Sequence, residues 1–311
     1  MHDNFFKATF EKPEYAADLI SNALPEELLR NIDLSTLKLS PNSYVDENLK
    51  SQFADLVYNC KLKQKSEVLI SILLEHKSQK PKYPHIQLLS YMLNIWKDDI
   101  TNKRDLRIVI PIVIYHGRER WEYRPFKEYF KSLVPYMESF IPDFKFILED
   151  LKRYSLKEVN RRYKYAEVKF FVNLVRNIFN LRRLFGELPD IFLYAGQIIK
   201  SEQQRFYIRI GLLYLFKQVP AEYRDTLLEL ISKTTEEGET MTKTIAEALI
   251  EEGEQRGRYV GWQEGELSGV VKSIIQMAKK TDFSVEKIAD ILEVDVDFVK
   301  QTLKKHGLLK E

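Results

Sequence analysis

The stretch SILLEHKSQ, residues 71–79, places an apolar run directly before two charged side chains. Its first part has the aliphatic composition of a buried strand. Glu75 and Lys77 follow at the end of this run, separated by one residue. Because residues two positions apart lie on the same face of a strand, we expect the carboxylate and the ammonium to project together. The stretch therefore predicts a buried strand that ends in a charged pair on one face.

The segments around this strand predict an α/β core with a mixed sheet over residues 1–150. Apolar residues at three- and four-residue steps predict helix over residues 4–30, with a break at Pro13. The remaining segments of the core are a first hairpin strand FADLVYNCKL (53–62), a helix HIQLLSYMLNIWKD (85–98), a central strand LRIVIPIVIYHG (106–117) and a further strand DFKFILEDL (143–151). The central run is apolar almost throughout, which is typical of a strand buried on both faces.

Two further parts follow the predicted core. Residues 151–235 have a helical pattern and are predicted to form a helical extension that packs on the core. Residues 236–311 are predicted to form a glycine-repeat helical connector and a C-terminal helical hairpin. In the connector, glycines stand at every fourth position from 253 to 269. This spacing favours either a close helix–helix contact between subunits or a charged linker.

The predicted hairpin covers residues 284–307 and resembles a helix-turn-helix in outline. Asp295 and Asp297 stand at the start of its second helix, where contacts to DNA would favour positive charge. We therefore expect the hairpin to serve packing or pairing, and we expect the C-terminal tail to form a homo-oligomer.

The bulk composition excludes several classes of protein. The 48 Lys and Arg residues nearly balance the 46 Asp and Glu residues, so the formal net charge is +2 and a wholly polybasic binder is excluded. A single cysteine, Cys60, cannot form an internal disulfide, which favours a reducing compartment. The sequence has no secretory signal and no apolar run long enough for a membrane span. We therefore expect a cytoplasmic protein without a membrane partner.

Motifs for nucleophilic catalysis and nucleotide binding are absent from the sequence. It has no G-x-S-x-G, no G-x-x-x-x-G-K-[ST] and no G-x-G-x-x-G, and its five histidines lack zinc-ligand spacing. Chemistry based on carboxylate oxygens remains. A lone D-x-K or E-x-K is a weak signal, and Asp150-Leu-Lys152 is another example. Glu75 and Lys77 differ because they follow a long buried strand whose hairpin partner carries its own acid, Asp55.

The register of the hairpin decides whether Asp55 joins the charged pair. With an odd number of residues in the turn, Asp55 lies on the face of the charged pair. In a turn from Leu62 to Ser66, for instance, Lys61 pairs with Glu67 and Asp55 faces Leu73. With an even turn, Asp55 pairs with Leu74 and points away, because a slip of one residue reverses every side chain. A metal-binding function therefore predicts an odd turn or a bulge.

Two carboxylates on one face suit a hard divalent cation, typically Mg²⁺ and also Mn²⁺ or Ca²⁺. Asp55 and Glu75 are the candidate ligands. Such a metal polarises a phosphoryl oxygen and lowers the pKa of bound water. Lys77 is placed to orient the nucleophile or to stabilise charge on a phosphate, and Gln87 on the next helix is placed to support it. The alternative is structural, with Asp55, Glu75 and Lys77 as a salt-bridged rim of the sheet.

Several motifs in order carry a resemblance to a known family. They are HDNFFKATF (2–10), LPEELL (24–29), SYVDENLKSQFADLVY (43–58), LLEHKSQ (73–79), LLSYMLNIW (88–96) and IVIPIVIYHG (108–117). Over about the first 230 residues the chain resembles the Rpn family, the recombination-promoting nucleases that are also labelled YhgA-like transposases. The tail resembles the variable C-terminal part of such proteins.

The Rpn family is similar to the PD-(D/E)xK nuclease superfamily, which implies a restriction-endonuclease-like mixed sheet flanked by helices and metal-dependent DNA cleavage. Asp55 matches the strand aspartate of the superfamily, and Glu75 and Lys77 match its E-x-K pair. Gln87 stands where a helix residue often assists. For the acid of the first helix, the resemblance favours Asp3 as a further metal ligand over Glu11.

The resemblance implies a metal-dependent DNA endonuclease of low sequence specificity that promotes recombination. The alternative is a catalytically inactive DNA-binding or assembly protein with the same fold. DNA binding requires a phosphate-binding surface, and residues 145–183 contain 11 Lys or Arg against four Asp or Glu, interleaved with aromatic residues. This stretch is a candidate for contact with the DNA backbone without sequence preference.

Overall fold

Strands from the first half of the chain form one mixed sheet in the computed structural model, which describes residues 2–40, 56–64, 69–198, 201–234 and 269–308, with 243, 246, 247, 250 and 254. Among these residues the sheet has five strands in chain order, β1 (Ile32–Leu39), β2 (Leu56–Leu62), β3 (Leu69–Lys77), β4 (Ile108–Tyr115) and β5 (Ile147–Asp150). The first three strands pair antiparallel, whereas β3, β4 and β5 pair parallel. The predicted mixed sheet is confirmed.

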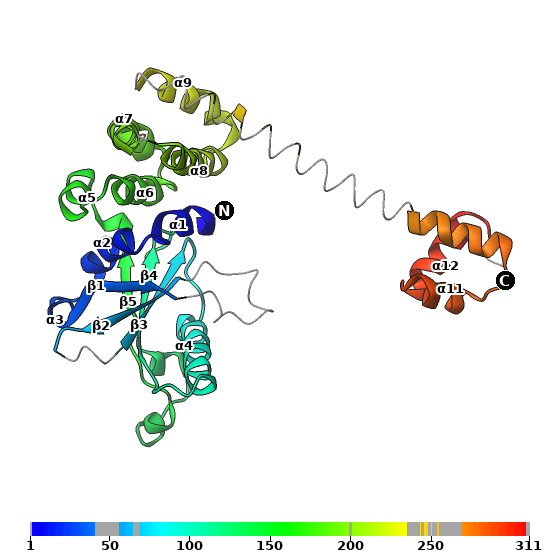
Figure 1. Ribbon diagram of the computed structural model, residues 1–311, viewed down its shortest axis with the longest axis horizontal. Helices are drawn as coiled ribbons and strands as arrows, with labels where there is room; N and C mark the ends of the chain where they lie inside the picture. Colours follow the sequence, from blue (N-terminus) through cyan, green and yellow to red (C-terminus); the bar gives the residue numbers. More distant parts are fainter. Residues whose placement is uncertain are drawn as a thin grey trace. The chain divides into compact units, whose positions relative to one another are not determined.

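Helices cover both faces of the sheet (Figure 1). Before the sheet stand α1 (His2–Phe10), α2 (Pro13–Ala23), which begins at the predicted break, and α3 (Glu26–Asn31). The helix α4 (Pro84–Thr101) is the crossover that joins β3 to the parallel β4. The connection from β4 to β5 contains the short 3-10 helices η1 (Phe126–Tyr129) and η2 (Pro135–Phe140).

An all-helical region follows β5, as the sequence predicts. Its elements are η3 (Leu151–Arg153), α5 (Leu156–Arg162), α6 (Ala166–Asn177), α7 (Leu181–Ile198), α8 (Glu202–Gln218), η4 (Ala221–Tyr223) and α9 (Arg224–Thr234). Figure 1 shows α6 next to α1 and α2, on the side of the sheet opposite α4, with α7, α8 and α9 beyond it. None of the described helices has the length and apolarity that crossing a membrane requires.

Aromatic rings join α1 and α6 to one face of the sheet. Phe6 of α1 stacks on His76 of β3, with ring centroids 4.7 Å apart and an interplanar angle of 6°. Phe10 meets Phe171 of α6 edge to face at 4.9 Å. All four side chains are buried. This face therefore contains a closely packed aromatic core that fixes the first helix on the sheet.

The opposite face of the sheet packs against α4. The cluster consists of Leu88, Tyr91, Met92 and Ile95 from α4 with Val109, Val113, Tyr115, Trp121 and Phe146 from the strands and loops beneath. These α4 positions repeat at three- and four-residue steps, which is the pattern of a helix with one buried stripe. The sheet is therefore buried on both faces, as the apolar run of β4 predicts.

Most of the C-terminal tail belongs to a separate compact unit. The chain divides into units at residues 1–245 and 246–311. In the second unit, a helical stretch over residues 269–280 packs with α11 (Val285–Leu292) and α12 (Val296–Lys305) around Ile274, Ile288 and Val299. The predicted helical hairpin is confirmed, and the division at residues 150 and 235 stays a prediction.

Two features of the tail have a local explanation. Asp295 accepts hydrogen bonds from the backbone N–H groups of Asp297 (2.8 Å) and Phe298 (3.3 Å), so it caps the start of α12. Of the repeated glycines, Gly269 is described, and a Cβ there would meet nothing within 4 Å. Among the described residues, nothing at this position requires the absence of a side chain. The glycines from 253 to 265 lie outside the described residues.

A buried ion pair holds the end of α4 against the start of β4. Asp99 is fully buried and Arg107 is 8% exposed, and Nη2 of Arg107 lies 2.6 Å from Oδ1 of Asp99. Arg104 also donates to Asp99 at 3.1 Å, and Arg107 reaches Asn59 of β2 at 2.8 Å. Burial raises the pKa of Asp99, but the hydrogen bonds from both arginines outweigh it, so the pKa lies below its ordinary value.

We predict that Asp99→Ala lowers the free energy of unfolding by about 3–5 kcal/mol, because it leaves a buried guanidinium without its carboxylate. Chemical denaturation followed by circular dichroism measures this loss. Glu26→Ala is the matched control, since it removes an exposed ion pair with Arg30 and should barely move the midpoint. Equal midpoints for both variants would contradict the assignment.

The pH dependence of this pair follows from the direction of the shift. Because the pKa of Asp99 is lowered in the folded protein, its contribution to stability is complete above the unfolded-state value of about 3.9. It is lost as the pH falls through the lowered pKa. The stability difference between wild type and Asp99→Ala should therefore be constant at neutral pH and shrink in acid.

A close approach of two backbones fixes the other end of the β3–β4 pair. The N–H of His116 donates to the carbonyl of Lys77 at 3.1 Å. A Cβ on Gly117 would lie 2.3 Å from the carbonyl oxygen of Ser78 and 2.5 Å from the hydroxyl of Tyr115. Only glycine leaves room for the two chains to pass at this distance.

We predict that Gly117→Ala lowers the free energy of unfolding by about 1–3 kcal/mol, the usual cost of overpacking. The matched control is Gly186→Ala within α7, where a Cβ would meet nothing within 4 Å. That control should raise stability by up to about 1 kcal/mol, because alanine favours helix. Denaturant midpoints of the two variants that move in the same direction would refute the close approach at residue 117.

Candidate active site

The backbone of β3 places positions 75 and 77 on the face of the sheet that α4 covers. In the parallel ladder, Glu75 lies beside Val113 and Lys77 beside Tyr115. Both β4 residues belong to the cluster that packs against α4. Lys77 is partly buried, and the side chain of Glu75 lies outside the described set. The structure thus brings the two positions to one face, as the E-x-K spacing predicts for a strand.

The hairpin register has the parity of an odd turn, which a metal-binding function predicts, but its pairs are shifted by two residues from the Lys61–Glu67 example. Lys61 lies opposite Leu69, whereas the odd-turn example placed it opposite Glu67. The exemplified pair was wrong because the alternation of side chains sets the face of a strand but leaves the length of its turn open. The parity nevertheless matches an odd turn, since Val57 lies opposite Leu73 and also packs against the α4 cluster.

The predicted metal ligands lie outside what the structure describes. Asp55 is not among the described residues, and the side chains of Glu75 and Asp3 are not described either. Among the side chains that are described, no group of three or more His, Cys, Asp or Glu is arranged to hold a metal ion. The predicted ligand set is therefore untested. Its donors are carboxylate oxygens, and position 75 is at the end of a rigid strand, which fits a hard divalent cation.

The supporting residues come from opposite faces of the sheet. Gln87 lies in the first turn of α4, partly buried, and its amide donates to the hydroxyl of Tyr91 at 3.3 Å. It therefore belongs to the element that covers positions 75 and 77. Asp3 belongs to α1, which packs on the opposite face through Phe6. Glu11 follows the same helix and is exposed. The role of Asp3 as a ligand stays a prediction.

The ends of β4 and β5 add charged residues to the edge of the sheet where β3 ends. Asp150 lies beside Tyr115 in the parallel register and is 8% exposed. Burial raises its pKa, and its carboxylate accepts from the backbone N–H of Lys152 at 3.0 Å. The ammonium of Lys152 lies 5.0 Å from the centre of the Tyr115 ring. Asp150 entered the sequence analysis only as part of a weak D-x-K signal. Its position at the end of a parallel strand could have placed it near the site, because the ends of parallel strands meet at one edge of the sheet.

The predicted basic stretch 145–183 contains arginines that pair within the protein and other cations that are exposed to solvent. Arg176 has no exposed side-chain surface and pairs with Glu187, to which Arg183 also donates. Arg162 lies over the ring of Tyr154, 4.3 Å from its centre. These arginines hold the helices together. Others in the stretch, such as Lys157 and Arg161, are partly or fully exposed and remain candidates for contact with phosphates.

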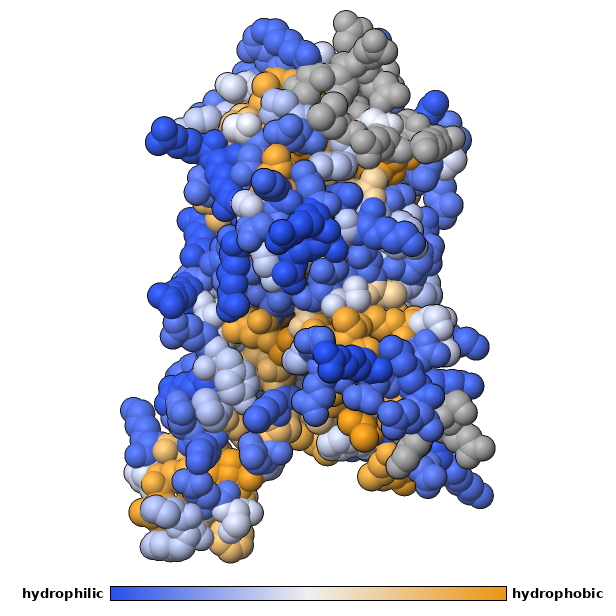
Figure 2. All heavy atoms as spheres, turned by 90° about the vertical axis from the view of Figure 1, so that its left-hand side faces the viewer, coloured by the Kyte–Doolittle hydropathy of each residue, from blue (hydrophilic) through white to orange (hydrophobic). Residues whose placement is uncertain are grey.

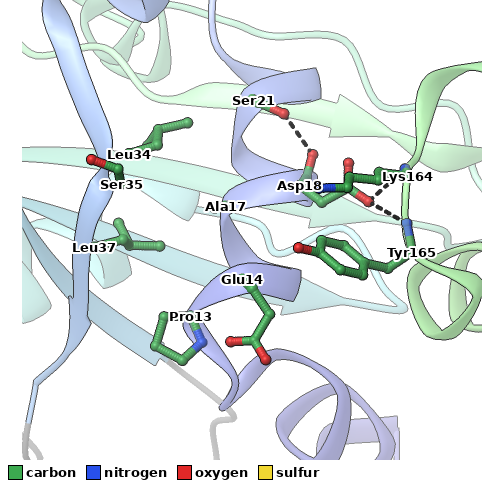
Figure 3. A pocket seen from close by; sticks show the side chains of 10 residues that line it. All are labelled: Pro13, Glu14, Ala17, Asp18, Ser21, Leu34, Ser35, Leu37, Lys164 and Tyr165. Atoms are coloured by element: carbon green, nitrogen blue, oxygen red, sulfur yellow. Dashed lines mark hydrogen bonds between the residues drawn. The ribbon is translucent and has the colours of Figure 1, made fainter.

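A pocket of about 550 Å³ lies between α2, β1 and the segment before α6 (Figure 3). Asp18 accepts hydrogen bonds from the backbone N–H groups of Lys164 (2.8 Å) and Tyr165 (3.1 Å), and burial raises its pKa. Figure 3 shows the Tyr165 ring extending toward α2 between Glu14 and Asp18. Because α2 packs with α1 and α6, this pocket is on the face opposite Lys77 and contributes nothing to the predicted site.

The connection between β4 and β5 carries exposed hydrophobic side chains. Phe130, Tyr136, Met137 and Phe140 are exposed, with Phe140 at 84%. Figure 2 shows hydrophobic side chains at the lower end of the visible face, the level at which this connection lies in Figure 1. The upper part of the same face, over the helical region, is mostly hydrophilic.

The chain is similar in sequence to a known family and to several known proteins. The family model described as "Putative transposase, YhgA-like" matches residues 1–205, which include every described strand of the sheet. Over 294 residues, 90% of each chain, the protein is 24% identical to "Inactive recombination-promoting nuclease-like protein RpnE" of Escherichia coli strain K12. No solved structure matches.

Two further relatives align over a shorter segment. "Recombination-promoting nuclease RpnD" of Escherichia coli O157:H7 is 31% identical over 118 residues, 37% of this chain and 45% of the relative. "Recombination-promoting nuclease RpnA" of strain K12 is 29% identical over 119 residues, 38% of this chain and 40% of the relative. The family model covers well over half of the chain, so the resemblance indicated by the motifs is confirmed and the protein belongs to the YhgA-like transposase family, together with the Rpn recombination-promoting nucleases.

Proposed function

We propose that the protein is a metal-dependent DNA endonuclease of low sequence specificity that acts in recombination. One observation carries the proposal. Positions 75 and 77 share the α4 face at the end of β3, at the edge where the parallel β4 and β5 also end. Relatives named as recombination-promoting nucleases support the reaction class.

Each residue of the proposed site has a chemical role. Asp55 and Glu75, with Asp3 as a further candidate, would hold Mg²⁺ or a similar cation. The cation would activate water and stabilise charge on the phosphate. Lys77 would place its ammonium next to the attacking water or the phosphate, where a fixed positive charge favours the transition state. Gln87 would orient the same water through its amide, from a helix that packing holds on this face.

The competing proposal is an inactive DNA-binding or assembly protein with the same fold. The relative that aligns over 90% of both chains is named as inactive, which favours this alternative. The two proposals differ in a single measurable property. An enzyme nicks DNA in the presence of a divalent metal, whereas the inactive protein binds DNA and leaves it intact.

We predict that Lys77→Ala and Asp55→Ala lower Mg²⁺-dependent nicking of supercoiled plasmid by at least about 100-fold, the usual cost of removing a group that stabilises the transition state. Rates from gel analysis with Mg²⁺ and with EDTA measure the effect. Lys80→Ala is the matched control, since it removes an exposed cation three residues from Lys77. Its rate should stay within a few-fold of the wild-type rate.

Two outcomes would contradict the enzyme. If both variants nick at the wild-type rate, the residue assignment is wrong. If the wild-type protein binds DNA and cuts none with Mg²⁺, Mn²⁺ or Ca²⁺, the inactive DNA-binding protein is the better description.

We also propose that the C-terminal unit mediates self-association. Ile250, Phe283 and Ile291 are large apolar residues of this unit that are exposed in the single chain. Light scattering of a chain that ends before Met241 should give a monomer, while the full-length chain should give an oligomer. A full-length monomer, or an oligomer of the same order after truncation, would refute this role of the tail.

A further inference from the structure

We propose that a basic pocket beside the proposed catalytic edge binds a backbone phosphate of the DNA strand. The pocket has a volume of about 460 Å³, and Arg118 and Lys152 contribute positive charge to it. Arg176 also lines the pocket, but its charge is paired with Glu187. None of the described residues that line it is Asp or Glu. The inference rests on the proposed function, and it assigns a substrate-binding site that the E-x-K residues do not include.

The pocket lies at the edge of the sheet where Lys77 stands. Arg118 follows the end of β4, and Lys152 follows the end of β5. Both strands are parallel to β3, so their carboxyl ends meet at one edge. Lys152 links the pocket to the site, because its ammonium lies over the ring of Tyr115, the register partner of Lys77. The rest of the lining comes from the end of α6, the start of α7 and the end of α8, on the side of the sheet opposite α4 (Figure 1). A DNA strand with a phosphate at Lys77 would therefore reach the pocket by crossing this edge of the sheet, where Lys152 lies.

The guanidinium of Arg118 lies over an aromatic ring, a contact that favours its place at the pocket. Its central carbon lies 5.1 Å from the centre of the Phe179 ring. Phe179 in turn stacks on His116, with ring centroids 5.8 Å apart and an interplanar angle of 7°. The Arg118 side chain is exposed, so N–H groups of its guanidinium are accessible from solvent. Paired N–H donors of a guanidinium match the two oxygens of a phosphodiester.

The other two cations are held in place by the fold. Lys152 donates to the carbonyl oxygen of Glu119 at 2.8 Å. Arg176 is buried and donates to Asn173 at 2.8 Å and to the carbonyl oxygen of Tyr154 at 2.9 Å. Burial lowers the pKa of Arg176 to about 10, so it stays protonated at neutral pH. Arg176 is paired with Glu187, and the Lys152 ammonium lies 3.9 Å from a carboxylate oxygen of Asp150. These two residues therefore form a fixed wall of the pocket, and Arg118 provides the exposed positive charge that a phosphate would contact.

The chemistry of the lining favours the DNA backbone over a free nucleotide. The sequence has no glycine-rich phosphate loop of the kind that binds a free nucleotide. Asn180 and Gln218 in the lining can hydrogen-bond phosphate or sugar oxygens without reading a base. Such contacts position a strand and carry no sequence preference, which matches a nuclease of low specificity.

The test is a DNA-binding titration of full-length Arg118→Ala in EDTA, where no cleavage occurs. Fluorescence anisotropy with a short labelled duplex gives the dissociation constant over a range of salt concentrations. Loss of one phosphate contact should weaken binding about tenfold at low salt and reduce the slope of log Kd against log salt by about 0.9. Arg120→Ala is the matched control, because it removes an 88% exposed cation two residues away that does not line the pocket.

The outcomes separate this inference from the proposed reaction. A reduced slope for Arg118→Ala and an unchanged slope for Arg120→Ala support the pocket. Equal slopes and affinities for Arg118→Ala and the wild type overturn it, and so does a wild-type protein that fails to bind DNA. Because the titration needs no metal, an inactive enzyme leaves the result interpretable. Conversely, suppose that the wild-type protein nicks plasmid DNA and that Arg118→Ala leaves the slope of log Kd against log salt unchanged. That result refutes the phosphate pocket and leaves the proposed reaction standing.

Discussion

The parallel pairing of β3 with β4 is the constraint on which the candidate site depends. The ladder runs from the Ile70–Ile108 pair to the Lys77–Tyr115 pair. A parallel pair needs a crossover connection, and α4 fulfils that need. The crossover helix then lies on the face to which positions 75 and 77 belong. One pairing thereby sets the face, the edge and the covering helix of the site.

Two local devices fix the ends of this ladder. At its start, the buried carboxylate of Asp99 ties the crossover helix to Arg107 and through it to the hairpin. At its finish, Gly117 lets the two chains pass in contact. Because both ends of the ladder are held, the backbone that carries positions 75 and 77 has a well-defined position. Rigid support of this kind is what a reacting group requires, since small displacements cost much of the rate.

The sequence predicted the parts of the fold that depend on local pattern. The central apolar run became β4, and the helical steps after Pro84 became α4, because burial of a continuous run or a single stripe decides these elements. The hairpin has the odd parity, but the Lys61–Glu67 pair was wrong, because the alternation of side chains does not fix the length of a turn. Arg118 was missed for another reason. It stands outside the basic stretch, and only the parallel order of the strands brings it beside Lys152.

The stacked rings have a consequence for the minimal folding unit. Phe6, His76, His116 and Phe179 form a continuous column of rings, with centroids 4.7, 4.6 and 5.8 Å apart. The first ring belongs to α1, and the last supports Arg118. Deleting the first helix would therefore uncover an imidazole in the core and loosen a support at the far end of the column. The stable folding unit therefore includes α1 as well as the sheet.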